Sequence, residues 1–245
     1  MHELAFPLLV GLIILALAFD FLNGLHDAAN SIATVVSTRL LSPVWAVVFA
    51  AFGNFAAYWL VGLHVAETVG KGIVDKDTVT PAVVFGALIG AMFWNVVTWL
   101  KGIPSSSSHA LIGGLLGAGI AHGGFGVVES SGTTKTVVAI FLSPMIGFAI
   151  AMFMVLLTSW LFKGFQPRRA EGVFKGLHLM SSAAYSISHG GNDAQKTMGI
   201  ITVLLYSTGQ LKGEFHVPEW VVISCYAAIA AGTLSGGWKI IKTMG

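Results

Sequence analysis

The sequence predicts an all-α polytopic membrane protein with two inverted structural repeats, broken helices and a re-entrant helical hairpin. The chain has 245 residues, of which 55% are hydrophobic and 10% are charged, whereas soluble proteins carry about 25% charged residues. Long apolar segments recur along the chain, and one polar motif occurs twice. Ionisable groups are costly at membrane depth, so a polar motif in such a chain indicates a functional site.

Composition also excludes several classes of site. The net charge is +2 without a basic run, which argues against nucleic acid as a partner. Cys225 is the single cysteine, so an internal disulfide and a cysteine-based metal site are excluded. No resident cofactor is expected. The N-terminal residues lack a basic region before the first apolar segment, which we interpret as a retained transmembrane helix.

The apolar segments define the predicted spans and domains. The first repeat is expected at 1–162, with spans at about 4–22, 43–63, 82–100 and 136–162 and a re-entrant segment at 103–121. A basic linker at 163–176 follows, and the positive-inside rule places it in the cytoplasm. The second repeat is expected to start at 177 and to be incomplete at 245. An inverted repeat with an odd number of crossings before the linker would place Met1 outside.

The main polar motif runs from His189 to Ile201 within an apolar stretch. It contains one carboxylate, two amides, a lysine and a hydroxyl. Gly190 and Gly191 are expected to break the membrane helix, because glycine is a poor helix former. A half-helix starting there would point its free N–H groups and its positive dipole end at an anion.

An earlier stretch, Asn23 to Ser31, matches this motif in weaker form. Gly24 aligns with Gly190, and Asp27 aligns with Asp193 at the same offset. On a helix, the polar residues of this stretch fall on one face; they are Asn23, Asp27, Asn30 and Thr34. A site element that recurs in each half is typical of a transporter built from two repeats.

A third polar stretch interrupts the apolar sequence between Lys101 and Ala110. Pro104, four serines and His109 precede an apolar run of about a dozen residues, which is too short to cross a bilayer. The serines can cap the short helix that follows. The sequence therefore predicts a hairpin whose tip presents hydroxyls and free N–H groups to a protein-lined cavity.

These stretches resemble the signatures of the inorganic phosphate transporter (PiT) family. The matching segments are Gly24-Leu-His-Asp-Ala-Ala-Asn-Ser, Gly102-Ile-Pro-Ser-Ser-Ser-Ser-His-Ala-Leu-Ile-Gly-Gly, Ser188-His-Gly-Gly-Asn-Asp-Ala-Gln-Lys-Thr-Met-Gly and Gly232-Thr-Leu-Ser-Gly-Gly-Trp-Lys-Ile-Ile-Lys-Thr-Met-Gly. The resemblance implies a multi-pass symporter of the plasma (inner) membrane that imports inorganic phosphate with H⁺ or Na⁺ by alternating access. Two features depart from the family pattern: His26 replaces a common Asn, and the second serine-threonine hairpin is absent. We therefore expect the natural protein to continue beyond Gly245.

The predicted site combines anion donors with coupling carboxylates. Phosphate ligands are expected at Ser105, Ser106, Ser107, Asn192, Gln195 and Thr197. The coupling ion is expected at His26, Asp27, Asn30 and Asp193, with Na⁺ at the last three if Na⁺ is the ion. Supporting roles are expected for Asn23, His189 and Lys196. The carboxylates would repel phosphate unless a proton or a cation binds with it.

Three alternatives remain beside phosphate symport. A sulfate permease of the same family would use the same site, because sulfate is also tetrahedral. An ammonium-type channel would use His109 and His189 but leave the aspartates unexplained. An intramembrane serine hydrolase would need a serine with a histidine base, yet no nucleophile-elbow motif occurs. We therefore expect no enzyme activity. The expected partners are inorganic phosphate, the lipid bilayer and a second copy of the chain in a homodimer.

Overall fold

The structure is a computed structural model that describes residues 6–63, 74, 78–213, 216–236, 240 and 242. Most of the loop predicted between 64 and 81, and much of the C-terminal segment after Gly236, lie outside the described residues, as do the side chains at 167–169 of the basic linker. The helices are α1 (Phe6–Ser37), α2 (Pro43–Leu60), α4 (Pro81–Lys101), α5 (Ser107–Gly123), α6 (Ser130–Leu161), α7 (Pro167–Ser207) and α8 (Glu219–Ser235). The described chain otherwise holds a short 3₁₀ helix (Phe125–Val127) and an isolated bridge between Val74 and Val128. The predicted all-α class is confirmed.

Among the residues that the structure describes, four helices are long and apolar enough to cross a membrane, namely α1, α2, α4 and α6. Local sequence explains where several helices begin and end. Proline occupies the first turn of α2, α4 and α7, where its missing N–H costs nothing. Thr80 caps α4, and Gly102 ends it in the left-handed conformation with φ 67°. The early start of α7 means that much of the predicted linker is helical.

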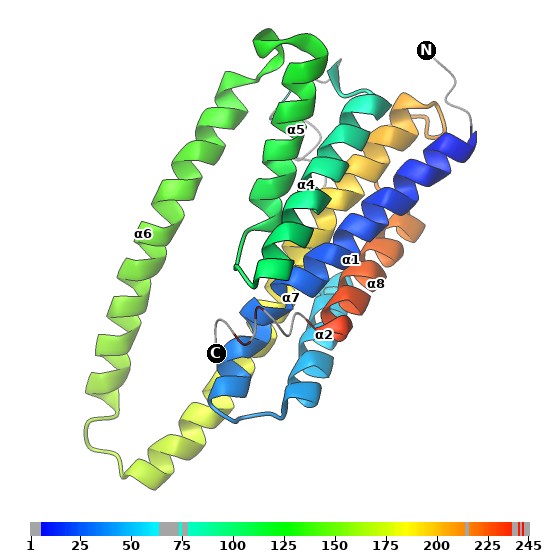
Figure 1. The fold of residues 1–245 in the computed structure, drawn as a ribbon. Coiled ribbons are helices and arrows are strands. Elements are labelled where there is room, and N and C mark those ends of the chain that lie inside the picture. Colours follow the sequence, from blue (N-terminus) through cyan, green and yellow to red (C-terminus); the bar gives the residue numbers. More distant parts are fainter. Residues whose placement is uncertain are drawn as a thin grey trace.

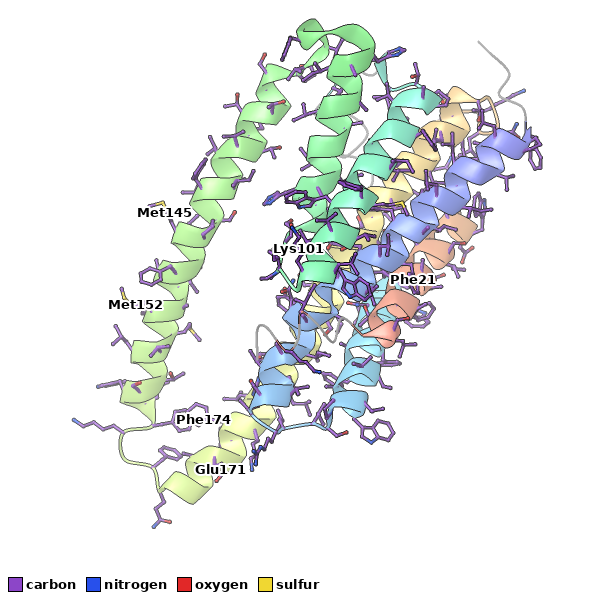
Figure 2. All side chains as sticks on the ribbon, in the orientation of Figure 1. Phe21, Lys101, Met145, Met152, Glu171 and Phe174 are labelled. Carbon is purple, nitrogen blue, oxygen red and sulfur yellow. The ribbon has the colours of Figure 1, made fainter. Side chains whose placement is uncertain are left out.

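The helices form one bundle with α6 apart from it (Figure 1). In the bundle, α1 packs along α8 and α7 packs along α2. The two helices that carry the repeated motif, α1 and α7, cross the bundle in opposite directions (Figure 1). Helix α6 has no buried residue, and Met145 and Met152 project from it away from the protein (Figure 2).

The helix break predicted at Gly190 and Gly191 is wrong, because α7 continues through both residues. The glycines instead permit close packing between helices. A Cβ atom on Gly190 would lie 2.6 Å from Cα of Asn54 on α2, and one on Gly191 would lie 2.8 Å from Cγ2 of Val61. Gly24 likewise permits close packing of α1 against α8, since a Cβ atom at this position would lie 2.9 Å from the carbonyl carbon of Ile229.

The predicted helical hairpin is confirmed by α4 and α5. The two helices lie side by side and antiparallel, joined by residues 103–106. Figure 1 shows that the tip of this hairpin stops partway along the bundle, next to α1 and short of the lower ends of α1 and α2. The serine-rich tip is therefore held inside the protein rather than at either end.

Candidate functional site

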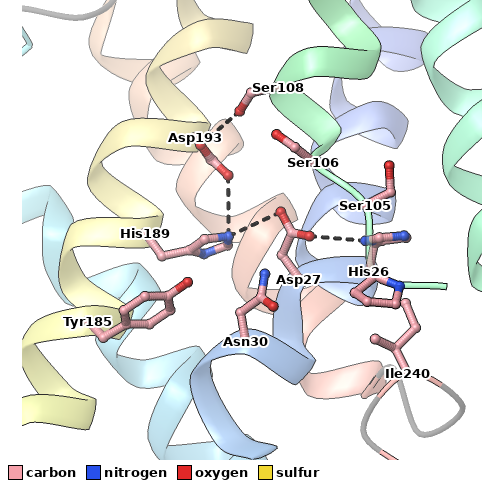
Figure 3. A pocket seen from close by; sticks show the side chains of 11 residues that line it. His26, Asp27, Asn30, Ser105, Ser106, Ser108, Tyr185, His189, Asp193 and Ile240 are labelled. Carbon is pink, nitrogen blue, oxygen red and sulfur yellow. Dashed lines mark hydrogen bonds and ion pairs between the residues drawn. The ribbon is translucent and has the colours of Figure 1, made fainter. Parts of the chain in front are cut away.

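The two motif helices and the hairpin tip enclose one polar cavity of about 390 Å³ (Figure 3). It is lined by His26, Asp27, Asn30, Pro104, Ser105, Ser106, Ser108, Tyr185, His189, Asp193 and Ile240. Helix α1 supplies the first three of these residues, the hairpin supplies the next four, and α7 supplies Tyr185, His189 and Asp193. The cavity therefore joins the three stretches that the sequence marks as polar.

Asp27 is buried at the centre of this site. Its Oδ1 lies 3.0 Å from Nδ1 of His26, and its Oδ2 lies 3.5 Å from Nε2 of His189. Ser107 donates its hydroxyl to the same Oδ2 at 3.5 Å. Donors from α1, α7 and α5 thus converge on one carboxylate, so the position of the hairpin tip depends on Asp27.

Asp193 is the second buried carboxylate. Its Oδ2 lies 3.2 Å from Nε2 of His189, and its Oδ1 accepts from Lys196 at 2.5 Å. Ser108 donates to Oδ1 at 3.5 Å and also contacts the Lys196 ammonium. The imidazole of His189 therefore bridges Asp27 and Asp193 (Figure 3).

In His26 and in His189, each of the two ring nitrogens lies near an oxygen atom that can accept a hydrogen bond. Nδ1 of His189 lies 3.3 Å from Oδ1 of Asn54, whose amide nitrogen donates to Thr233. Nε2 of His26 lies 3.0 Å from the hydroxyl of Thr98, which donates to a backbone carbonyl. An imidazole donates from both nitrogens only when it is protonated. Each ring therefore has oxygen partners for both of its nitrogens.

The N-terminus of α5 opens beside the cavity. Ser106 is its cap and accepts a hydrogen bond from the backbone N–H of His109 at 3.3 Å, which confirms the predicted capping role of the serines. Ser105 accepts from the indole of Trp94 at 3.0 Å. The start of a helix carries free N–H groups and a partial positive charge, so it favours an anion.

The structure brings all four predicted coupling residues together. His26, Asp27, Asn30 and Asp193 line the cavity, as does His189. Ligand atoms of Asp27, His189 and Asp193 lie within 4.8 Å of one another, a spacing that could hold a metal ion. The Na⁺ ligands expected from the sequence were Asp27, Asn30 and Asp193, so Asp27 and Asp193 belong to both sets.

Four of the six predicted phosphate ligands do not line the cavity. Ser107 is buried and donates to Asp27. Asn192 is exposed and donates to the carbonyl of Ser188 at 2.9 Å. Gln195 is buried and donates to the carbonyl of Gly62 at 2.7 Å. Thr197 is buried and donates to Asp20 at 2.5 Å. Because α7 is continuous, Asn192 and Gln195 face other directions than His189 and Asp193, which are one turn apart on one face. Thr197 lies near that face but one turn beyond Asp193, outside the cavity. The support residue Asn23 is buried but does not line the cavity either.

Two cavity residues with polar side chains, Ser108 and Tyr185, were not assigned to the site from the sequence. Ser108 belongs to the predicted tip but lies on the far side of the capping serine, against Asp193 and Lys196. Tyr185 lies one turn before His189 on α7, and the two rings stack with centroids 6.4 Å apart. Helical spacing from His189 was the signal that could have found Tyr185.

Comparisons with known proteins agree with these motifs. The profile of the "Phosphate transporter family" matches residues 23–245. The chain is 63% identical over 242 residues to a "Probable low-affinity inorganic phosphate transporter" of Rhizobium meliloti (strain 1021), covering 99% of this chain and 72% of that protein. It is 43% identical over 236 residues to a protein of the same description from Bacillus subtilis (strain 168), covering 96% and 71%.

The fold also matches a solved structure. That protein is described as "The sodium-dependent phosphate transporter", and the match has a TM-score of 0.87 with 24% sequence identity. It covers 97% of this chain and 78% of the other. At this identity the match supports the helical fold, while the profile and the close relatives establish ancestry. On these grounds, the chain belongs to the phosphate transporter family.

Proposed function

We propose that the chain imports inorganic phosphate across the plasma membrane by cation symport and alternating access. The observation that carries the proposal is the cavity in which serine hydroxyls and the start of α5 face two carboxylates that are paired with Lys196 and with the imidazoles of His26 and His189. The family and the descriptions of the relatives from Rhizobium meliloti and Bacillus subtilis support phosphate as the substrate.

The cavity offers donors for a phosphate anion without an arginine. The hydroxyls of Ser105, Ser106 and Ser108 line it, and the first turn of α5 adds backbone N–H groups. Neutral hydroxyls and amides hold an anion less firmly than a bidentate guanidinium does. A carrier must release its substrate on the second side, so this donor set suits transport.

The net charge of the site favours binding of an anion when its histidines are protonated. Lys196 and the imidazoles of His26 and His189 contact Asp27 and Asp193. When both imidazoles are protonated, three positive groups face two carboxylates, and one negative charge is accommodated. Loss of a proton from either histidine removes that balance. Phosphate binding is therefore linked to proton binding at this site.

The same geometry is compatible with two coupling ions, H⁺ and Na⁺. A proton on His26 or His189 would enter and leave with phosphate, as the preceding balance requires. A Na⁺ ion would instead use oxygen ligands, which Asp27, Asn30 and Asp193 supply around the cavity. In the second case the imidazoles would be neutral, and Na⁺ would replace their charge.

The hydroxyls of the tip do not form the geometry expected of a hydrolase. Ser107 and Ser108 donate to the carboxylates of Asp27 and Asp193. Lys196 contacts Ser108 but is also paired with Asp193, which favours the charged ammonium over a general base. A serine nucleophile needs an adjacent unprotonated base, so transport accounts better for these contacts.

The test is uptake of radiolabelled phosphate by cells that lack their own phosphate uptake and express the full-length protein. Excess sulfate serves as competitor, and Na⁺ or the pH gradient is removed in turn. Phosphate uptake that excess sulfate does not inhibit, and that stops when the pH gradient is removed, supports phosphate–proton symport. Uptake that stops without Na⁺ identifies Na⁺ as the coupling ion. Strong competition by sulfate, or transport of sulfate itself, would overturn the assignment of phosphate.

A matched pair of serine variants tests the site itself. Ser107→Ala removes a donor to a buried carboxylate, which is worth about 1.5–3 kcal/mol for a charged partner. We expect it to raise the KM for phosphate by about tenfold or more. Ser224→Ala on α8 removes a hydroxyl that bonds only within its own helix at 2.6 Å, and uptake should be unchanged. Equal KM values for both variants would exclude Ser107 from the site.

A further inference from the structure

A second acidic residue, Asp20, lies in α1 outside the substrate cavity. It precedes Asp27 by two helical turns, so both carboxylates face the same side of the helix. Its side chain is fully buried, with 0% exposure. Thr197 of α7 donates to Oδ1 at 2.5 Å, whereas Oδ2 has no hydrogen-bond partner within the described part of the chain.

Few groups near Asp20 can stabilise a negative charge. The described groups that act on it electrostatically are Thr197, Asp193 and Lys196 of α7 and Cys225 of α8. The thiol of Cys225 is only a weak donor. The Lys196 ammonium is bonded to Asp193 and Ser108, and the charge of Asp193 opposes a second negative charge close by.

An ionised carboxylate needs more compensation than this site supplies. Buried charges in proteins are paired, hydrogen-bonded or bound to a cation, and otherwise they become neutral. A cation at Asp20 would need several oxygen ligands. The described carboxylate and histidine group that could hold a metal ion contains Asp27, His189 and Asp193 but not Asp20. A proton on the unpartnered Oδ2 removes the charge with no further ligand.

We propose that Asp20 is a proton-binding site of the transport cycle, separate from the substrate cavity and linked to it through Thr197. The inference rests on the proposed symport function. In this conformation the proton is bound to Oδ2 as a neutral carboxyl group. When the protein opens to the other side, water reaches the carboxyl group and Oδ2 releases the proton to that water, leaving the carboxylate.

The position of Thr197 couples proton binding at Asp20 to substrate binding in the cavity. Thr197 lies one turn after Asp193 on α7, so a shift of α7 that accompanies substrate release also moves the donor of Asp20. A carboxylate at Asp20 would repel Asp193, and a neutral carboxyl group would not. Proton occupancy at Asp20 and the charge state of the cavity therefore bias one another, which is the energetic requirement of coupling.

The test uses Asp20→Asn, which replaces the neutral carboxyl group with a neutral amide of the same shape. The purified full-length protein is reconstituted into vesicles, and two activities are compared. Phosphate accumulation is driven by a pH gradient, and phosphate exchange is measured with phosphate on both sides and no gradient. Glu171→Gln is the matched control, because Glu171 is an exposed carboxylate paired with Lys175 at 2.7 Å.

We expect Asp20→Asn to lose accumulation above equilibrium but to retain exchange, while Glu171→Gln retains both. Accumulation by Asp20→Asn equal to that of the unaltered protein would overturn the proposal and leave phosphate transport intact. Absence of exchange by the unaltered protein would instead refute the proposed function. The two failures are therefore distinguishable.

A spectroscopic measurement keeps the proposal testable if the asparagine variant folds poorly. Infrared spectra report the carbonyl stretch of a protonated carboxyl group directly. We expect such a band in the unaltered protein at neutral pH and its loss in Asp20→Asn and in Asp20→Leu. A spectrum without this band in the unaltered protein would show that Asp20 is ionised, and the proposal would fail.

Discussion

Replacement of Gly190 by alanine should destabilise the protein, although alanine is the better helix former. In an unobstructed helix, Gly→Ala stabilises by about 0.5–1 kcal/mol. At Gly190 the new Cβ would lie 2.6 Å from Cα of Asn54, whereas carbon atoms pack best at about 3.5–4.0 Å. Helices α7 and α2 must therefore separate by about 1 Å, and overpacking of this kind costs about 1–3 kcal/mol.

Gly176 is the matched control within the same helix. A Cβ on Gly176 has no heavy atom within 4 Å. Gly176→Ala should therefore raise the free energy of unfolding by the difference in helix propensity alone. Both variants gain the propensity term, so they should differ by the overpacking cost of about 1–3 kcal/mol in the free energy of unfolding. Thermal unfolding of the detergent-purified protein should then show midpoints separated by about 2–12 °C, at about 2–4 °C for each kcal/mol.

The comparison also separates two explanations of the glycine pair. If Gly190 provided a flexible break, alanine would stiffen α7 without a clash, and both variants would be as stable as the parent or more so. Equal midpoints for the two variants would therefore refute the close-packing argument. A lower midpoint for Gly190→Ala alone would support it, because a Cβ on Gly190 meets α2 whereas a Cβ on Gly176 meets nothing within 4 Å.

Two further predictions concern the charges of the cavity. Asp27→Asn should abolish gradient-driven phosphate uptake, because the histidines and Ser107 lose the carboxylate on which they converge; full uptake by correctly folded variant protein would remove Asp27 from the mechanism. Lys196→Met should lower thermal stability by about 1–3 kcal/mol, the cost of removing a charged donor from a buried acceptor, and should weaken phosphate uptake because the site loses the positive charge beside Asp193. Lys196→Arg should restore part of both; a methionine variant with unchanged stability and KM would show that the pair contributes nothing.

Helix α6 has no buried residue, and the sequence did not reveal this. Its hydropathy predicts a span, and the structure confirms a helix of sufficient length. Its lack of buried residues follows from its position apart from the bundle. Hydropathy responds equally to lipid and to apolar protein, so periodicity cannot decide which of them covers such a helix.

The sequence by itself determined the class of fold, the three polar stretches and their chemistry. Long uninterrupted apolar segments of low charge predict helices, because a helix satisfies its own backbone within the membrane and barrel strands would instead alternate apolar and polar residues. The repeated motif identified Asp27 and Asp193, and the serine run identified the hairpin tip. Each of these inferences depends on local composition or spacing, and the structure brings these residues to one cavity.

Only the tertiary structure decided which motif residues face that cavity. The glycine pair reads as a helix break when α2 is not known to lie against it, so the helical phase of Asn192 and Gln195 was lost. The continuous helix turns these two residues away from the cavity, and it places Thr197 one turn beyond Asp193, where Thr197 donates to Asp20. Which face of a helix meets which neighbour depends on contacts between residues far apart in the chain, and no local pattern encodes those contacts.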